Sequence, residues 1–157
     1  MSWRAAERAW GWPSAKARET GGKKGGIAVE IKLMGIASSP LTRTPRHQHS
    51  DWEIVLYLEG QAVHMVGDTI FNVSPGMILC QPPGIPHETV SEQGFRDMYF
   101  QAGGFTPPGE KKIPVFTDDT ERRFYTLLSY AYNSFHQREA NYAAIINTLG
   151  EAMRQLL

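Results

Sequence analysis

Short runs of alternating apolar and polar residues fill the middle of the chain, from Ile27 to about Phe116. Turn residues separate them: Glu59-Gly60 and Gly67-Asp68 lie between consecutive runs and supply the backbone freedom that tight hairpins require. Such a pattern is typical of an antiparallel sandwich or barrel and not of βαβ units. The predicted strands are Ile27–Leu33, Trp52–Leu58, Ala62–Val66, Thr69–Val73, Met77–Gln81, His87–Val90 and Phe95–Gln101.

The apolar period becomes helical after Pro114 and produces two stripes. Asp118 and Glu121 have the spacing of a capping box and predict the start of the first helix. Both stripes must be buried on the barrel, on each other or on a second copy of the chain. They consist of Phe124, Leu127, Leu128, Ala131 and Phe135, and of Tyr142, Ile145, Ile146, Leu149, Met153, Leu156 and Leu157.

Residues 1–26 differ from the rest, because six basic side chains accompany only two acidic ones and four glycines come late in the segment. The three tryptophans Trp3, Trp10 and Trp12 have no periodic apolar partners. We predict a disordered basic leader. An arm that folds over a pocket or a partner is the alternative.

The formal charges balance, with 16 basic and 16 acidic side chains in 157 residues. Since the leader is basic, the remainder is acidic, which argues against a nucleic-acid footprint over the folded part. The length suits one domain, and no apolar run approaches the roughly 20 residues of a membrane-spanning helix. Charged residues interrupt the stretch where the apolar core of a signal peptide would lie. We interpret the single cysteine, Cys80, as a small buried hydrophobic residue. We predict a cytoplasmic protein without a membrane partner.

Two imidazoles and a carboxylate, His47, His49 and Glu53, occupy positions of equal parity, so on an extended chain they would point to the same side. A third imidazole, His87, follows a Pro-Pro-Gly turn. Three histidines and one carboxylate are a typical ligand set for Mn, Fe, Ni, Cu or Zn with open positions for a further ligand. His64 and His136 are interpreted as surface or satisfied core residues.

These residues resemble the two sequence motifs of the cupin superfamily. His47-x-His49, Glu53 and Gly60 have the spacing of the first motif, and Gly76, Pro82-x-Gly84 and His87 that of the second. Leu41 and Ser91 depart from the usual glycine and asparagine, at positions that are not metal ligands in cupins. The resemblance implies a mainly β fold: a double-stranded β-helix, or jelly-roll barrel, over 27–116 with the four ligand-type residues at its mouth.

Within the cupins, the wording Trp-Glu-Ile-Val-Leu-Tyr-Leu-Glu-Gly and Pro-Pro-Gly-Ile-Pro-His looks like the arabinose-binding and dimerisation domain of AraC-type transcription regulators. In that family a helix pair follows the barrel, forms the dimer interface and leads into a helix-turn-helix region. We therefore expect the chain to form a homodimer through residues 117–157. No helix-turn-helix region follows in this sequence, so DNA binding is expected only through a domain that this chain lacks.

Two functions are compatible with these patterns. The first is a sensor without catalytic activity that binds a small effector, such as a sugar, in the barrel. Its ligand-binding residues would be His47, His49, Glu53, His87, Tyr57 and Trp52. The second is a small metal-dependent enzyme, a dioxygenase or a sugar or sugar-acid isomerase, in which His47, His49, Glu53 and His87 hold the metal. A sensor that recognises its effector through a bound divalent metal (Mn, Fe, Ni or Zn) combines the two.

Overall fold

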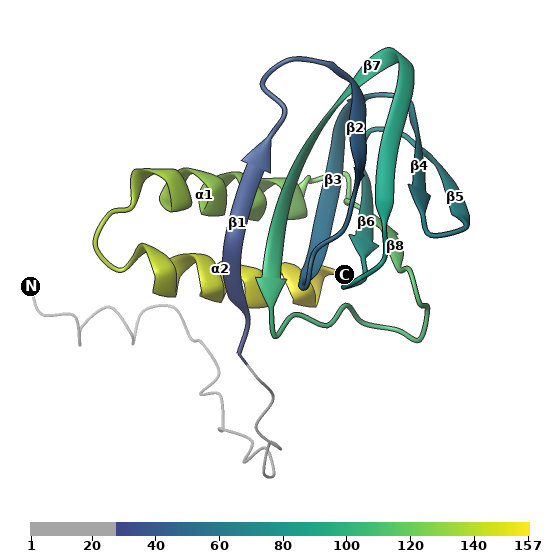
Figure 1. Cartoon of the computed structure of the whole chain (residues 1–157). Coiled ribbons are helices and arrows are strands. Elements are labelled where there is room, and N and C mark those ends of the chain that lie inside the picture. Colours follow the sequence, from purple (N-terminus) through teal and green to yellow (C-terminus); the bar gives the residue numbers. More distant parts are fainter. Residues whose placement is uncertain (1–27) are drawn as a thin grey trace, which may run out of the picture.

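The computed structural model describes residues 28–157, so the predicted leader lies outside the described residues (Figure 1). Eight strands precede two helices. The strands are β1 (Glu30–Ile36), β2 (Leu41–His47), β3 (Trp52–Gly60), β4 (Ala62–Val66), β5 (Thr69–Val73), β6 (Met77–Gln81), β7 (His87–Gly103) and β8 (Val115–Thr117), and the helices are α1 (Arg123–Gln137) and α2 (Tyr142–Leu156). The predicted jelly-roll barrel followed by two helices is confirmed.

The long strand β7 joins the two parts of the curled antiparallel sheet. Its first residues pair with β2 and β4, and its last residues pair with β1 and β3. At the end of β3, Gly60 has a φ of +78°, and a Cβ there would lie 2.1 Å from the carbonyl oxygen of Gly94. Only glycine fits this close approach of two chain segments, so Gly60 belongs to the bend that curls the sheet.

Strand β3 is buried on both faces, which gives the protein two apolar clusters. Ile54 and Leu56 face the helices, whereas Val55 and Tyr57 face the interior of the barrel. Cys80 lies fully buried in the helix-side cluster, as predicted, and burial raises the pKa of its thiol to about 12. The alternation along β3 therefore separates a structural face from the face that forms the interior cavity.

The helix pair covers the outer face of the barrel beside β1 (Figure 1). The backbone N–H of Ile31 donates a 2.9 Å hydrogen bond to Oδ1 of Asn147 in α2. A Cβ on Gly150 would lie 2.8 Å from Val29, so this glycine permits close packing of α2. The stripes are thus buried by the chain's own barrel and by each other. The inward-facing helix residues are Phe124, Leu128, Ala131, Ile146, Gly150 and Met153.

The predicted capping box is wrong in its form. Helix α1 begins at Arg123, and its N-cap residue Arg122 has a left-handed backbone without a side-chain cap. Asp118 instead accepts hydrogen bonds of 3.0 Å from the backbone N–H groups of Phe124 and Tyr125. The carboxylate still satisfies the free N–H groups of the first turn, but it reaches them across a longer loop. Neither described helix is long and apolar enough to cross a bilayer.

Candidate metal and ligand site

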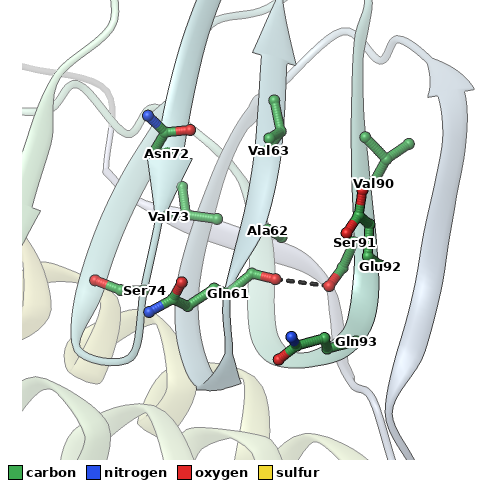
Figure 2. Close-up of a pocket in the computed structure, with 10 residues that line it drawn as sticks. All are labelled: Gln61, Ala62, Val63, Asn72, Val73, Ser74, Val90, Ser91, Glu92 and Gln93. Atoms are coloured by element: carbon green, nitrogen blue, oxygen red, sulfur yellow. Dashed lines mark hydrogen bonds between the residues drawn. The ribbon is translucent and has the colours of Figure 1, made fainter.

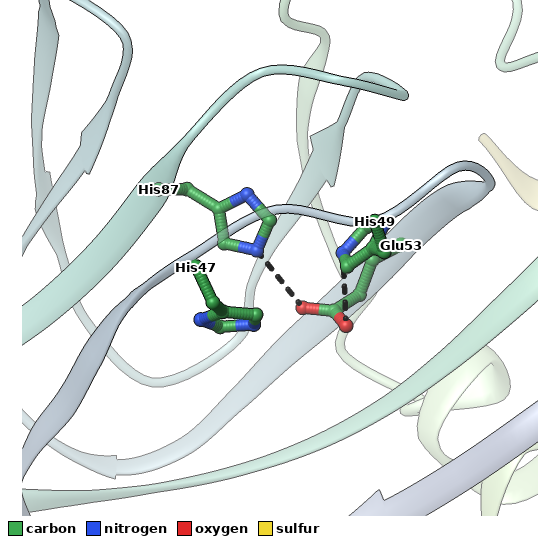
Figure 3. A group of neighbouring side chains, drawn as sticks. All are labelled: His47, His49, Glu53 and His87. Carbon is green, nitrogen blue, oxygen red and sulfur yellow. Dashed lines mark ion pairs between the residues drawn. The ribbon is translucent and has the colours of Figure 1, made fainter.

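Four side chains with metal-ligand chemistry meet at one end of the barrel (Figure 3). His47 is the last residue of β2, His49 lies in the following turn, Glu53 is on β3, and His87 opens β7. One potential ligand atom from each of them lies within 4.8 Å of the others. Strand parity does not explain the position of His49, because β2 ends before this residue and β3 begins after it. Convergence comes instead from the β2–β3 turn beside the start of β7.

The three imidazoles share one hydrogen-bonding pattern. In each of them Nδ1 lies within hydrogen-bond distance of a backbone carbonyl oxygen two residues away, and a carbonyl can only accept. The proton of the neutral ring therefore sits on Nδ1, and the Nε2 lone pair stays free to bind a cation. The pairs are His47 with Pro45 at 2.7 Å, His49 with Asp51 at 2.7 Å and His87 with Ile85 at 2.9 Å.

Glu53 provides the negative charge of the cluster. Its Oε2 accepts a 2.7 Å hydrogen bond from Nε2 of Gln101 and lies 3.3 Å from Nε2 of His49, while Oε1 lies 3.9 Å from Nε2 of His87. Burial alone raises the pKa of Glu53, but the contacts with His49 and Gln101 outweigh it and lower that pKa below its ordinary value. Glu53 is therefore a carboxylate at neutral pH.

The partly buried His49 and the buried His87 respond differently to this carboxylate. The hydrogen bond that a protonated His49 ring would donate to Glu53 raises the pKa of His49, whereas burial lowers the pKa of His87. A free lone pair on Nε2 of His49 would repel the carboxylate of Glu53. A cation between the two groups, either a proton or a metal ion, is therefore favourable. His87 keeps its lone pair available at neutral pH.

A cavity of about 550 Å³ extends from this cluster into the barrel. His47, Glu53 and His87 line one end of it. Tyr57, which was predicted as a ligand-binding residue, lines it as well, as does Val55, and both belong to the interior cluster. The remaining polar wall residues include His64, Gln81, Thr89, Asp97, Tyr99 and Gln101.

A family model, the AraC-like ligand binding domain, matches residues 33–105. The match runs from within β1 to just beyond β7 and includes the whole four-residue cluster. Residues 33–105 are an AraC-like ligand-binding domain. The resemblance to the sensor domain of AraC-type regulators is thereby confirmed for this part of the chain.

Several solved structures show a low similarity to the AraC-like domain. Oxalate decarboxylase of Bacillus subtilis is 24% identical over 41% of this chain and 19% of its own, with a TM-score of 0.37. Salicylate 1,2-dioxygenase of Pseudaminobacter salicylatoxidans is 14% identical over 47% of this chain and 21% of its own, with a TM-score of 0.39.

A protein of unknown function from Streptococcus pyogenes is 19% identical over 53% of this chain and 68% of its own, with a TM-score of 0.39. The aligned region thus covers about a fifth of each of the two enzymes. These similarities are too low to bear on what the domain binds. None of the curated proteins matches the chain in sequence.

The four-residue cluster of the AraC-like domain fits a divalent metal. Nε2 of both His49 and His87 is buried without a hydrogen-bond partner among the described residues. An unsatisfied buried polar atom costs about 1–3 kcal/mol, so two of them aimed at one carboxylate indicate a missing cation. Three imidazole nitrogens and one carboxylate suit Mn, Fe, Ni or Zn.

Two predicted ligand-binding residues lie outside the cavity of the AraC-like domain. His49 contacts the cluster but is not among the residues lining the cavity. Trp52 packs against the helix-side cluster, because its parity on β3 is opposite to that of Glu53. Its indole therefore belongs to the face of β3 that the helices cover.

His64 is a cavity residue that the sequence interpretation did not include. It is 1% exposed, and its Nδ1 lies 2.7 Å from Oγ1 of Thr89 and 3.0 Å from the hydroxyl of Tyr57. Its ring stacks on His87 with centroids 6.2 Å apart, and its Nε2 has no partner. Burial lowers the pKa of His64 to about 4, so the ring is neutral. His136, by contrast, lies exposed on α1 against Tyr132, as predicted.

A second hollow of about 620 Å³ lies beside the start of β4, the end of β5 and an inner part of β7 (Figure 2). Its lining is mostly uncharged, and Ser91 donates a 2.6 Å hydrogen bond to the carbonyl of Gln61. It contains one acidic side chain, Glu92, and no histidine. Although this hollow is larger, the unsatisfied imidazoles make the barrel cavity the candidate site of the AraC-like domain.

Proposed function

We propose that this AraC-like domain binds a small-molecule effector in the barrel cavity and that a divalent metal held by His47, His49, Glu53 and His87 forms part of the site. One observation carries the proposal: among the described residues, four of the five buried side-chain atoms without a hydrogen-bond partner belong to the cluster or to the cavity wall. They are Nε2 of His49, His64 and His87 and Oε1 of Gln81. A ligand would satisfy them.

A bound metal would supply an electrophilic centre with open positions for an oxygen ligand. The residues of the chain orient that site. The carbonyl contacts of the three imidazoles fix their tautomers, and Gln101 holds one oxygen of Glu53. Tyr57, His64 and Thr89 form a hydrogen-bonded group that begins beside the cluster, where the His64 ring lies 6.2 Å from that of His87, and a second part of the effector would bind along it.

Strand β1 offers a route from effector binding to regulation. Gly35 and Ile36 line the cavity, whereas Val29 and Ile31 pack against α2 and bond to it through their backbone. β1 and the helices would move together between two arrangements. An effector that binds one of these arrangements more tightly would shift the population toward it. Control of transcription would further require a DNA-binding domain in addition to residues 28–157.

Homodimerisation through the helix pair is part of the proposal, although less apolar surface remains for it than the stripes suggested. Tyr130 is 59% exposed, and Ile145 and Leu156 are each 37% exposed. Light scattering at micromolar concentration tests this: a dimer supports the proposal, and a monomer contradicts it.

Effector binding is tested by blocking the mouth of the cavity. Ser39 lines the cavity and is exposed, so Ser39→Trp can obstruct entry without disturbing the core. Gln93→Trp places the same side chain in the second hollow as a matched control. Wild type and both variants are screened by thermal shift against monosaccharides, hydroxy acids and aromatic acids. Stabilisation that disappears only in Ser39→Trp supports the proposal, and hits that are unaffected by this variant contradict it.

A metal-dependent enzyme is the second candidate, and the His₃Glu donor set favours it. The two functions differ in what happens to a bound compound. Each thermal-shift hit is incubated in air with metal-loaded protein and followed by mass spectrometry after chromatographic separation of isomers. The sensor predicts recovery of the unchanged compound; oxygenated or isomerised product that disappears in Glu53→Gln would establish the enzyme.

A further inference from the structure

The cavity has a second polar end, which is built by the same strand pair that positions Glu53. Along β3 and β7 the residues Glu53 and Gln101, Val55 and Tyr99, and Tyr57 and Asp97 are cross-strand partners. Partners that lie directly opposite in an antiparallel pair point to the same face, and all six residues line the cavity. They form three rungs, and at 3.3–3.4 Å per residue the first and third are about 13 Å apart.

The opposite wall connects the two ends of the cavity. His64 on β4 pairs with Thr89 on β7, its ring lies 6.2 Å from that of His87 in the cluster, and its Nδ1 lies 3.0 Å from the hydroxyl of Tyr57. The imidazole is fixed by the hydroxyl groups of Tyr57 and Thr89, while its Nε2 has no partner among the described residues. Nε2 of His64 can therefore bind a ligand group that lies between the cluster and the third rung.

Asp97 is the charged group of the far end. Its side chain is nearly buried, with 9% of the residue exposed, and it forms no ion pair with any residue in 28–157. Among the described residues, no lysine or arginine lines the cavity. A buried carboxylate without a cation is costly for the fold, which indicates that it is kept for a partner that binds there.

We propose that Asp97 is a specificity-determining residue that selects effectors carrying a hydrogen-bond donor, most strongly a cationic amine, at the end remote from the metal cluster. The effector would be bifunctional, with an oxygen chelating group at the His₃Glu end and a donor group at the Asp97 end. Val55 and Tyr99 would contact the less polar segment between them. This inference rests on the proposed effector site.

The test uses three hydroxamates that are about 13 Å long and that end in an ammonium, a hydroxyl or a methyl group. Calorimetry measures their binding to the zinc-loaded chain, to Asp97→Asn and to the exposed control Asp68→Asn. A charge-assisted hydrogen bond predicts that wild type binds the ammonium probe about 10–100 times more tightly than the methyl probe, with the hydroxyl probe between them.

Asp97→Asn should abolish this preference and leave the affinity for the methyl probe unchanged, which also shows that the variant is folded. Asp68→Asn should retain the preference. Equal affinities for the three probes in wild type, or a preference that survives in Asp97→Asn, would overturn the role of Asp97 while the effector site stands. Absence of binding by all three probes would contradict the proposed effector site itself.

Discussion

Gln101 donates a 2.7 Å hydrogen bond from its amide to Oε2 of Glu53, its cross-strand partner. The bond holds one oxygen of the carboxylate in place, and the other oxygen faces His87. Glu53 is thus oriented by a side chain that is not itself a metal-ligand candidate. Such outer contacts set the affinity of metal sites nearly as strongly as the ligands do.

Replacing Gln101 by leucine should therefore weaken metal binding by about 10–100-fold, because Glu53 loses its orienting donor. Competition with a chromophoric chelator measures the zinc affinity of the variant. Gln93→Leu, in the second hollow, is the matched control and should bind zinc as wild type does. An unchanged affinity in Gln101→Leu would show that the hydrogen bond does not position Glu53.

The titration of His49 should depend on Glu53. The Glu53 carboxylate accepts a hydrogen bond from the protonated ring and raises the pKa of His49 above its ordinary 6.5, so in metal-free protein the ring takes up a proton at a higher pH than a free histidine does. NMR titration of the ring protons measures the midpoint. Glu53→Gln should move it to lower pH; a midpoint that does not move would contradict the ion pair.

Asp97→Asn should stabilise the ligand-free protein at neutral pH. Burial, with a further contribution from the charge of Glu53, raises the pKa of Asp97 from 3.8 to about 6. The folded state thus holds the proton more tightly than the unfolded state. The stabilisation that the protonated Asp97 contributes is fully present below pH 3.8, is lost as the pH rises through about 6, and amounts to about 3 kcal/mol at most.

Urea denaturation between pH 4 and pH 8 measures this effect. The asparagine variant should lack the decrease and be more stable than wild type at pH 7. Parallel curves for the two proteins would show that Asp97 is not the group responsible. If Asp97→Asn is more stable than wild type and no longer prefers the ammonium probe, the carboxylate of Asp97 serves binding and lowers the stability of the fold.

Gly35 should be required for the position of Tyr99 in the cavity wall. A Cβ at Gly35 would lie 2.5 Å from the aromatic ring of Tyr99, so Gly35→Ala must displace the ring. We expect a loss of about 1–3 kcal/mol of unfolding free energy in Gly35→Ala. Adding Tyr99→Leu should restore part of it, and strictly additive effects in this double-mutant cycle would exclude the contact.

Much of the β core was predictable because short runs of strand-forming residues are separated by turn residues. The expected bounds of β4, β5 and β6 agree with the structure, and both helices follow the predicted stripes. Strand β2 was not predicted, because almost every residue in Leu41–His47 is exposed and Pro45 interrupts the run. Only pairing with β7 makes this edge segment a strand.

Strand β7 was predicted as two runs, His87–Val90 and Phe95–Gln101, but it is continuous from His87 to Gly103. The polar residues around Gly94 lie where the strand changes its partners, so they look like a turn when only local sequence is considered. Long-range pairing decides the structure there, and alternation within the segment cannot reveal it.

The cluster of His47, His49, Glu53 and His87 was predictable from residue type and spacing, but the far end of the cavity was not identified. His64 shares its parity on β4 with the buried Ala62 and Val66, a signal that could have placed it inside the barrel. Asp97 lies on the inward parity of β7 with Tyr99 and Gln101. Its position opposite Tyr57 depends on the register between β3 and β7, which the sequence alone does not fix.

The metal content of the chain is the most direct test of the proposed metal site at His47, His49, Glu53 and His87. Untagged protein is loaded with Mn, Fe, Ni or Zn, desalted and analysed for metal per chain, beside a variant in which His47, His49 and His87 are all alanine. We expect about one metal ion per chain in wild type and none in the variant. Wild type that retains no metal under any of these conditions, or a variant that retains as much as wild type, would contradict it.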